Sequence, residues 1–154
     1  MTLIEKLVSG GQTGADRSAL LWAIENHIPH GGWCPRGRLA EDGELAAVFH
    51  LEETPSSGYA QRTEWNVRDS DATVIFSISR SLSGGSLLTQ ELAAKWNRPW
   101  IRISRNGTRE PAKELNEFLD QNFVRILNVA GPRESTEPGV ADFVTEVLTA
   151  AMEG

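Results

Sequence analysis

The residues best suited to bind a ligand are gathered in two glycine-rich turns. The first runs from Ser9 to Gly14 (Ser-Gly-Gly-Gln-Thr-Gly) and joins an apolar run to a helical pattern. Glycine lets the main chain bend sharply and lets a ligand approach the backbone closely. A helix that starts here leaves unpaired N–H groups and the positive end of its dipole facing out of the turn. Such a turn favours a bound anion, most often a phosphate, without the need for a lysine.

Polar side chains around the first turn strengthen this interpretation. Thr13 is placed to cap the following helix while Asp16 reaches back, and Arg17 adds a fork of permanent positive charge. The chain contains no Gly-x-x-x-x-Gly-Lys-Ser/Thr loop, and the spacing Gly11-x-x-Gly14 misses Gly-x-Gly-x-x-Gly. A Walker-type loop is therefore excluded and a standard dinucleotide site is poorly supported. The alternative is a turn that serves strand-to-helix packing alone.

The second turn, Ser83 to Ser86 (Ser-Gly-Gly-Ser), follows the clearest buried strand of the sequence, Ala72 to Ser79. That strand is nearly all apolar or β-branched, as is typical of a central strand in a parallel sheet. A helix is expected to begin after the turn, at about Leu87. Two Gly-Gly turns at the mouths of two central strands favour a shared site more strongly than either turn alone.

A third group of polar residues lies in the glycine-punctuated loop after Trp33, where Arg36 and Arg38 precede Glu41 and Asp42. One interpretation is a loop that covers a ligand, with arginines meeting an anion and a carboxylate meeting a hydroxyl or a metal. The alternative is a solvated, charged loop.

The elements that must position these residues alternate between strand and helix. The expected strands are Leu3 to Val8, Ala72 to Ser79, Pro99 to Ser104 and Val124 to Ala130, and the expected helices are Ala15 to Asn26, Tyr59 to Ser70, Leu87 to Asn97, Pro111 to Asn122 and a last helix to about Met152. The stretch from His30 to Gly58 is expected to be a long ordered loop with one or two short strands. The alternation predicts an α/β fold, a Rossmann-like three-layer α/β/α domain over residues 1–154 with a mainly parallel central sheet.

In such sheets, ligands bind outside the carboxyl ends of the strands. The loops expected at those ends contain glycine, polar residues and arginine, including Arg133 after the last strand. The predicted ligand- or phosphate-binding residues are Gly10, Gly11, Gln12, Thr13, Gly14, Asp16, Arg17, Arg36, Arg38, Gly84, Gly85, Ser86, Thr89 and Arg133.

Composition excludes several other classes of function. The net charge of −6 argues against binding a nucleic acid polymer, although twelve of the fifteen basic residues are arginine, which suits a small anionic ligand. No apolar run is long enough to span a membrane and no signal-peptide pattern is present. The single cysteine, Cys34, favours the cytoplasm. His27, His30 and His50 lack zinc-ligand spacing, so no metal site is predicted.

Four segments together resemble one known family. They are Gly10 to Arg17, Gly32 to Gly43, Arg62 to Asp71 and Ser83 to Glu91, in this order along well over half the chain. They are similar to the "putative molybdenum carrier" family, a circularly permuted YpsA-like branch of the SLOG superfamily. The resemblance implies a Rossmann-like fold, a pocket for a small anionic nucleotide- or pterin-like ligand, and assembly into homo-oligomers such as dimers or tetramers.

A sister branch contains the LOG-type phosphoribohydrolases, which are related to lysine-decarboxylase-like proteins and carry Pro-Gly-Gly-x-Gly-Thr-x-x-Glu. The matching positions here are Gly84, Gly85 and Glu91, and the differing ones are Ser83, Leu87 and Leu88. The differences remove one glycine and one hydroxyl from the implied phosphate cradle. Glu91 survives, and a carboxylate beside a sugar could assist N-glycosidic cleavage.

Three functions follow as hypotheses. The first is a carrier for a phosphorylated, nucleotide-like small molecule, with molybdenum cofactor (a pterin with a phosphate) or a nucleotide as its cargo; which one is left unknown. The second is a nucleotide 5′-monophosphate phosphoribohydrolase with Glu91 and Arg62 as catalytic groups. The third is a nucleotide-sensing regulatory domain.

Overall fold

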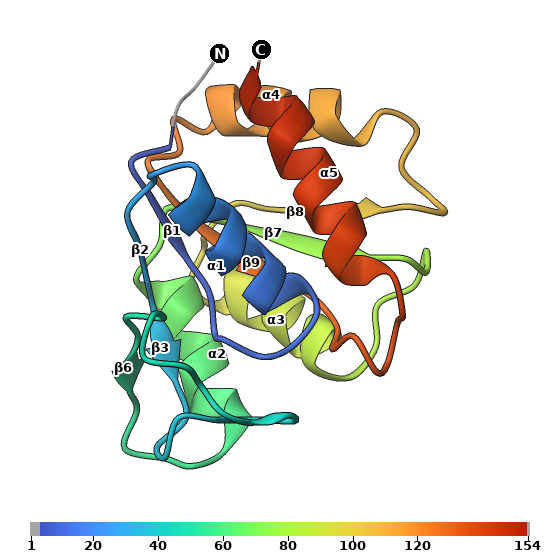
Figure 1. The fold of residues 1–154 in the computed structure, drawn as a ribbon. Coiled ribbons are helices and arrows are strands. Elements are labelled where there is room, and N and C mark those ends of the chain that lie inside the picture. The colour runs from blue at the N-terminus through green and yellow to red at the C-terminus, as the bar shows by residue number, and fades with distance from the viewer. Residues whose placement is uncertain (1–3, 154) are drawn as a thin grey trace.

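A five-stranded parallel sheet with helices on both faces forms the body of the protein (Figure 1). The structure is a computed structural model and describes residues 4–153; Leu3, expected in the first strand, lies outside them. The elements are β1 (Lys6–Val8), α1 (Ala15–Glu25), β2 (His30–Gly31), β3 (Trp33–Cys34), β4 (Leu39–Ala40), β5 (Gly43–Glu44), β6 (Glu52–Glu53), α2 (Tyr59–Arg68), β7 (Ala72–Ser77), α3 (Gly84–Lys95), β8 (Trp100–Ser104), α4 (Pro111–Gln121), β9 (Ile126–Ala130) and α5 (Val140–Glu153). The strand order is β2-β1-β9-β7-β8, which confirms the three-layer α/β/α prediction.

The two faces of the sheet are covered differently. Helices α1, α4 and α5 pack on one face, where Leu7, Phe76 and Leu127 belong to the main apolar core. Helices α2 and α3 cover the other face. Successive side chains of a strand point to opposite faces, so the buried polar Thr73 and Asn128 face α2 and α3. The amide of Asn128 donates to the Thr73 hydroxyl over 3.2 Å, which leaves a polar layer on this side of the sheet.

The stretch from His30 to Gly58 differs from the prediction. It contains five strands of two residues each, rather than one or two strands in a loop. The first of them, β2, pairs in parallel with β1 and extends the central sheet. The others form two small ribbons, β3 with β6 and β4 with β5. Strands of two residues are too short to show an alternating pattern, so the sequence did not reveal them.

The start of α3 also differs from the prediction. The helix begins at Gly84, not at about Leu87, so the glycines form its first turn. Gly84 has a φ of +53°, a conformation that glycine adopts at no steric cost. The second glycine turn is therefore the N-terminus of the helix itself.

A histidine pair joins β2 to the segment before β6. The backbone N–H of His50 donates to His30 Nε2 over 3.1 Å, and the two rings stack with centroids 5.3 Å apart. Partial burial lowers the pKa of His30 below its ordinary value of 6.5, and the nearby charges of His50 and Lys6 lower it further. Protonation of His30 would also remove the acceptor that His50 uses.

We expect this pair to make stability depend on pH. Because the pKa of His30 is lower in the folded chain than in the unfolded chain, the unfolded chain binds more protons below pH 6.5. The free energy of unfolding should therefore fall as the pH drops from 6.5 through the folded-state pKa. Urea unfolding at several pH values should show that the free energy of unfolding falls less with decreasing pH in His30→Gln than in the wild-type protein. The exposed His27→Asn is the control, and an unchanged slope in His30→Gln would contradict the assignment.

Candidate functional site

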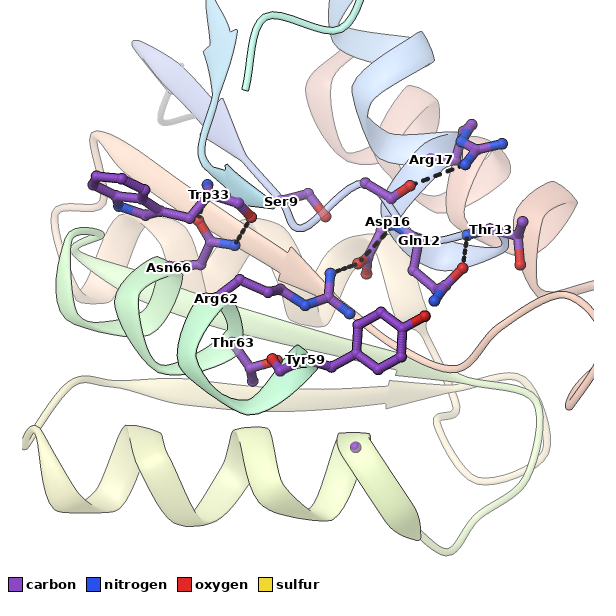
Figure 2. A network of polar contacts seen from close by, with 12 residues as sticks. Ser9, Gln12, Thr13, Asp16, Arg17, Trp33, Tyr59, Arg62, Thr63 and Asn66 are labelled. Atoms are coloured by element: carbon purple, nitrogen blue, oxygen red, sulfur yellow. Dashed lines mark hydrogen bonds and ion pairs between the residues drawn. The ribbon is translucent and has the colours of Figure 1, made fainter. Parts of the chain in front are cut away.

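The carboxyl edge of the sheet carries a cavity of about 390 Å³. The loops after β1, β7 and β9 meet there with the first turn of α2. The residues that line it are Gln12, Tyr59, Arg62, Thr63, Ser83, Gly84, Gly85, Ser86, Leu88, Gly131, Pro132, Arg133, Thr136 and Glu137. Figure 2 shows the side chains from the β1 loop and α2 that point toward one another near the start of α3. The two glycine turns therefore lie at the same edge of the sheet.

The N-terminus of α3 opens into this cavity without a cap. Within residues 4–153, no side chain caps its first turn, although the N-cap residue is Ser83. The last helix is different, because the Glu134 carboxylate accepts from the N–H groups of Gly139 at 2.7 Å and Ala141 at 3.1 Å. The free N–H groups of the first turn of α3 and its helix dipole are thus available to a ligand.

Two residues that line the cavity each have a buried donor with no protein partner in the described part of the chain. Gln12 is 5% exposed, and its Oε1 accepts from the backbone N–H groups of Thr13 and Glu41. Its Nε2 has no partner, and neither has Nε of Arg62, which is 8% exposed. An unpaired buried donor costs about 1–3 kcal/mol. A ligand acceptor that met both donors would remove this cost.

The guanidinium of Arg62 is held in place from three sides. Its Nη1 lies 3.1 Å from Oδ2 of Asp16, and its centre lies 5.3 Å from the ring centroid of Tyr59. A Cβ at Gly10 would come within 1.7 Å of Nη1, so only glycine leaves room for the guanidinium. Burial raises the pKa of Asp16, although Arg62 and the N–H of Gln12 act against the shift.

A second, smaller cavity of about 60 Å³ lies behind Arg62. It shares Arg62, Thr63, Gly85 and Gly131 with the larger one. The remaining residues that line it are Gly10, Asp16, Asn66, Thr89, Asn128, Val129 and Ala130. Most of these side chains are polar, so the site continues into the polar layer between the sheet and α2 and α3.

Arg133 supplies a second positive charge to the larger cavity. Its guanidinium centre lies 5.1 Å from the Tyr59 ring centroid, so that ring contacts both Arg133 and Arg62. An arginine that lies over an aromatic ring keeps its charge, and its N–H donors stay available to a ligand. The cavity therefore joins two guanidinium groups to an open helix N-terminus.

Eight of the predicted binding residues line one or both cavities. They are Gly10, Gln12, Asp16, Gly84, Gly85, Ser86, Thr89 and Arg133. The other six do not line either cavity, and they are Gly11, Thr13, Gly14, Arg17, Arg36 and Arg38. Their roles as ligand contacts stay predictions from the sequence, and the structure gives each a different surrounding.

The side chains of Thr13 and Arg17 bind acidic residues of the hairpin formed by β4 and β5. The Thr13 hydroxyl donates to the Glu41 carboxylate, which also accepts from Ser135. Arg17 makes two bonds to Asp42, at 2.6 and 3.1 Å, and a third to the Gly11 carbonyl. The expectation that Thr13 caps α1 is therefore wrong, because its hydroxyl meets a charged acceptor instead.

These contacts also shift two pKa values. Hydrogen bonds from Ser135 and Thr13 lower the pKa of Glu41, and the Arg17 guanidinium lowers the pKa of Asp42. Both carboxylates are exposed and stay charged at neutral pH. The covering loop predicted from the sequence thus contacts the β1 turn through its acids, while its arginines point elsewhere.

The two glycines of the β1 turn that do not line the cavities serve packing. Gly14, with φ +79°, would place a Cβ 2.5 Å from the Pro132 carbonyl. Gly11, with φ +83°, would place one 2.7 Å from Leu45. For these two positions the alternative interpretation, a turn shaped for packing, describes the structure.

Arg36, Arg38 and Glu91 lie away from both cavities. Arg38 donates to the carbonyls of Ala46, Phe49 and Leu51, and so ties its own loop together. Arg36 and Glu91 are exposed, Glu91 on the outer side of α3. Glu91 lines neither cavity, so its place beside a bound sugar stays a prediction from the sequence.

Sequence reasoning missed Tyr59, Thr63 and Glu137 as residues of the site. The pattern showed a helix from Tyr59, but not that its first turn lies over the carboxyl edge of the sheet. Tyr59 is the single tyrosine of the chain, which is a weak signal at most. Within residues 4–153, no group of three or more His, Cys, Asp or Glu side chains could hold a metal ion. Within the same range, no helix has the length and apolar character to cross a membrane.

Comparison with known proteins gives two matches. A model of the circularly permutated YpsA SLOG family matches residues 7–152. Among solved structures, the chain is 42% identical to a "Putative molybdenum carrier protein" from Syntrophus aciditrophicus SB, with a TM-score of 0.94. That match covers 97% of this chain and 95% of the other. A search of curated proteins found no match. The residues that line both cavities fall within the family match.

Proposed function

Because this chain belongs to the circularly permutated YpsA SLOG family, we propose that it binds and carries a phosphorylated, nucleotide-like small molecule. One observation carries the proposal. The uncapped N-terminus of α3 faces a cavity lined by Gln12 and Arg62, and each of these residues has a buried donor, Nε2 and Nε, with no protein partner in the described chain. Phosphate oxygens are the acceptors that such a set of donors suits best.

The charge and size of the cavity fit this ligand class. Arg62 and Arg133 offer two guanidinium groups for a phosphate, and the backbone of Gly84 and Gly85 leaves the helix end open. The volume of about 390 Å³ lies within the range of about 300–1,000 Å³ common for small-molecule sites. A phosphate at the α3 end would leave the rest of the cavity to a sugar, base or pterin.

Molybdenum cofactor is one candidate cargo and a nucleotide is the other. The name of the similar protein, "Putative molybdenum carrier protein", favours the first. Both molecules carry a phosphate, so the same donors would serve either. Carriage is proposed ahead of phosphoribohydrolase activity because Glu91, the expected catalytic carboxylate, lies outside the cavities.

The proposal predicts binding that depends on the phosphate and leaves the ligand intact. AMP should stabilise the protein by about 2.7 kcal/mol at a concentration a hundred times its Kd, whereas adenosine should have little effect. Thermal unfolding with AMP, adenosine and a pterin phosphate tests whether binding depends on the phosphate group. Chromatography of AMP after incubation with the protein tests whether the nucleotide stays intact. Equal stabilisation by adenosine would contradict the phosphate site, and release of adenine would show a hydrolase instead.

Two further expectations from the sequence are kept as proposals. We propose a cytoplasmic location because a chain with one cysteine forms no internal disulfide. We also propose a homo-oligomer, a dimer or a tetramer, from the family resemblance; light scattering after size-exclusion chromatography measures it.

A further inference from the structure

Glu137 lines the larger cavity and has no part in the proposed phosphate site. It lies in the loop between β9 and α5, and its side chain reaches the end of β7. Its Oε1 accepts from the backbone N–H groups of Ile78 at 2.7 Å and Ser79 at 2.8 Å. These two bonds fix the position of the carboxylate relative to the central strand.

The other carboxylate oxygen of Glu137 makes no such bond in the described part of the chain. Within residues 4–153, no group donates to Oε2 of Glu137. Among the described residues that line this cavity, Glu137 is also the one acid, while Gln12, Arg62 and Arg133 supply donors. A carboxylate oxygen accepts hydrogen bonds and repels a second anion.

We infer that Glu137 determines specificity by accepting hydrogen bonds from hydroxyl groups of the cargo. The inference rests on the proposed phosphate site, because it assigns a hydroxyl group of the same ligand to Glu137. The cavity thus selects a phosphorylated compound with free hydroxyls, such as the ribose of a nucleotide. It disfavours a ligand that places a second negative charge at this position.

The substitution Glu137→Gln isolates the proposed interaction. A glutamine keeps a carbonyl oxygen that can accept from Ile78 and Ser79, and it replaces the second oxygen with an NH₂ group. The anchor to β7 is retained while the acceptor that faces the ligand becomes a donor. The melting temperature and the backbone amide shifts of Ile78 and Ser79 show whether the anchor survives.

The probes are AMP and 2′,3′-dideoxy-AMP, titrated by calorimetry into the wild-type protein and Glu137→Gln. The wild-type protein should bind AMP about ten- to a hundredfold more tightly than it binds 2′,3′-dideoxy-AMP, as expected for hydrogen bonds to a charged acceptor. In Glu137→Gln this preference should shrink to within about threefold. The affinity for the dideoxy compound should be unchanged or higher, because a negative charge is removed.

The outcomes separate this inference from the proposed function. Equal affinity of the wild-type protein for both nucleotides would overturn the role of Glu137 and leave the phosphate site standing. So would an AMP preference that persists in Glu137→Gln. If neither nucleotide binds the wild-type protein, the phosphate site fails and the inference fails with it. The comparison of the two nucleotides on the wild-type protein holds even if the variant misfolds.

Discussion

Replacing Asp16 with alanine is expected to lower the free energy of unfolding by about 3–5 kcal/mol. The side chains of Asp16 and Arg62 are 8% and 10% exposed, and their charged atoms lie 3.1 Å apart. Removing the carboxylate leaves a buried guanidinium with no compensating charge, and the backbone N–H of Gln12 loses its acceptor. Urea unfolding of the two proteins at neutral pH measures the difference.

Two variants control for other causes of this loss. Asp42→Ala removes the exposed partner of Arg17, an ion pair whose loss should cost at most about 1 kcal/mol. Asp16→Ala combined with Arg62→Met removes both buried charges and should recover at least about 2 kcal/mol relative to Asp16→Ala. Recovery is expected because burying the charged pair costs desolvation free energy. That cost is reflected in the pKa of Asp16, which burial raises despite the nearby Arg62. An Asp16→Ala protein as stable as Asp42→Ala would refute the buried-pair account.

Replacing Gly85 with valine is expected to weaken AMP binding by about a hundredfold without destabilising the fold. A Cβ at Gly85 meets nothing within 4 Å, because this position faces the open cavity. Its φ is not in the left-handed region, and valine forms helix somewhat better than glycine. The branched side chain would instead fill the space that a phosphate needs at the helix N-terminus. A hundredfold loss corresponds to about 2.7 kcal/mol of binding free energy.

Calorimetric titration of AMP measures this loss, and Leu87→Ala is the matched control. Leu87 lies in the first turns of α3, is 40% exposed and does not line either cavity, so its truncation should leave AMP affinity within about twofold. Unchanged AMP affinity in Gly85→Val would show that the ligand does not approach the start of α3. A lowered melting temperature in the same variant would show that Gly85 serves packing.

Much of the fold could be predicted because its central elements have strong patterns. The apolar, β-branched run of β7 and the strand–helix alternation around it identify a parallel sheet. That sheet in turn indicates where Gly10 and Gly85 must lie, since the carboxyl ends of parallel strands share one edge. Gly10 and Gly85 are 75 positions apart in the sequence, and the topology of the sheet brings their two turns to the same edge.

The rest of the site depends on side-chain directions that a linear pattern does not contain. Arg38 and Arg133 both lie in loops that contain glycine and proline, and the sequence does not distinguish them. In the structure, Arg38 binds carbonyls of its own loop while Arg133 lines the cavity. Thr13 meets Glu41 because a hairpin of two-residue strands folds back over the β1 turn. Glu91 matches a sequence motif, but its position on α3 turns it toward solvent.

The most direct test follows the proton–nitrogen NMR signals of the donors themselves while AMP is added to the uniformly labelled protein. We predict that the backbone signals of Gly84 and Gly85 shift together with the side-chain signals of Gln12 Nε2 and Arg62 Nε, and that adenosine moves them far less. If those four signals stay in place while AMP shifts others, the donors around the α3 N-terminus are not a phosphate site.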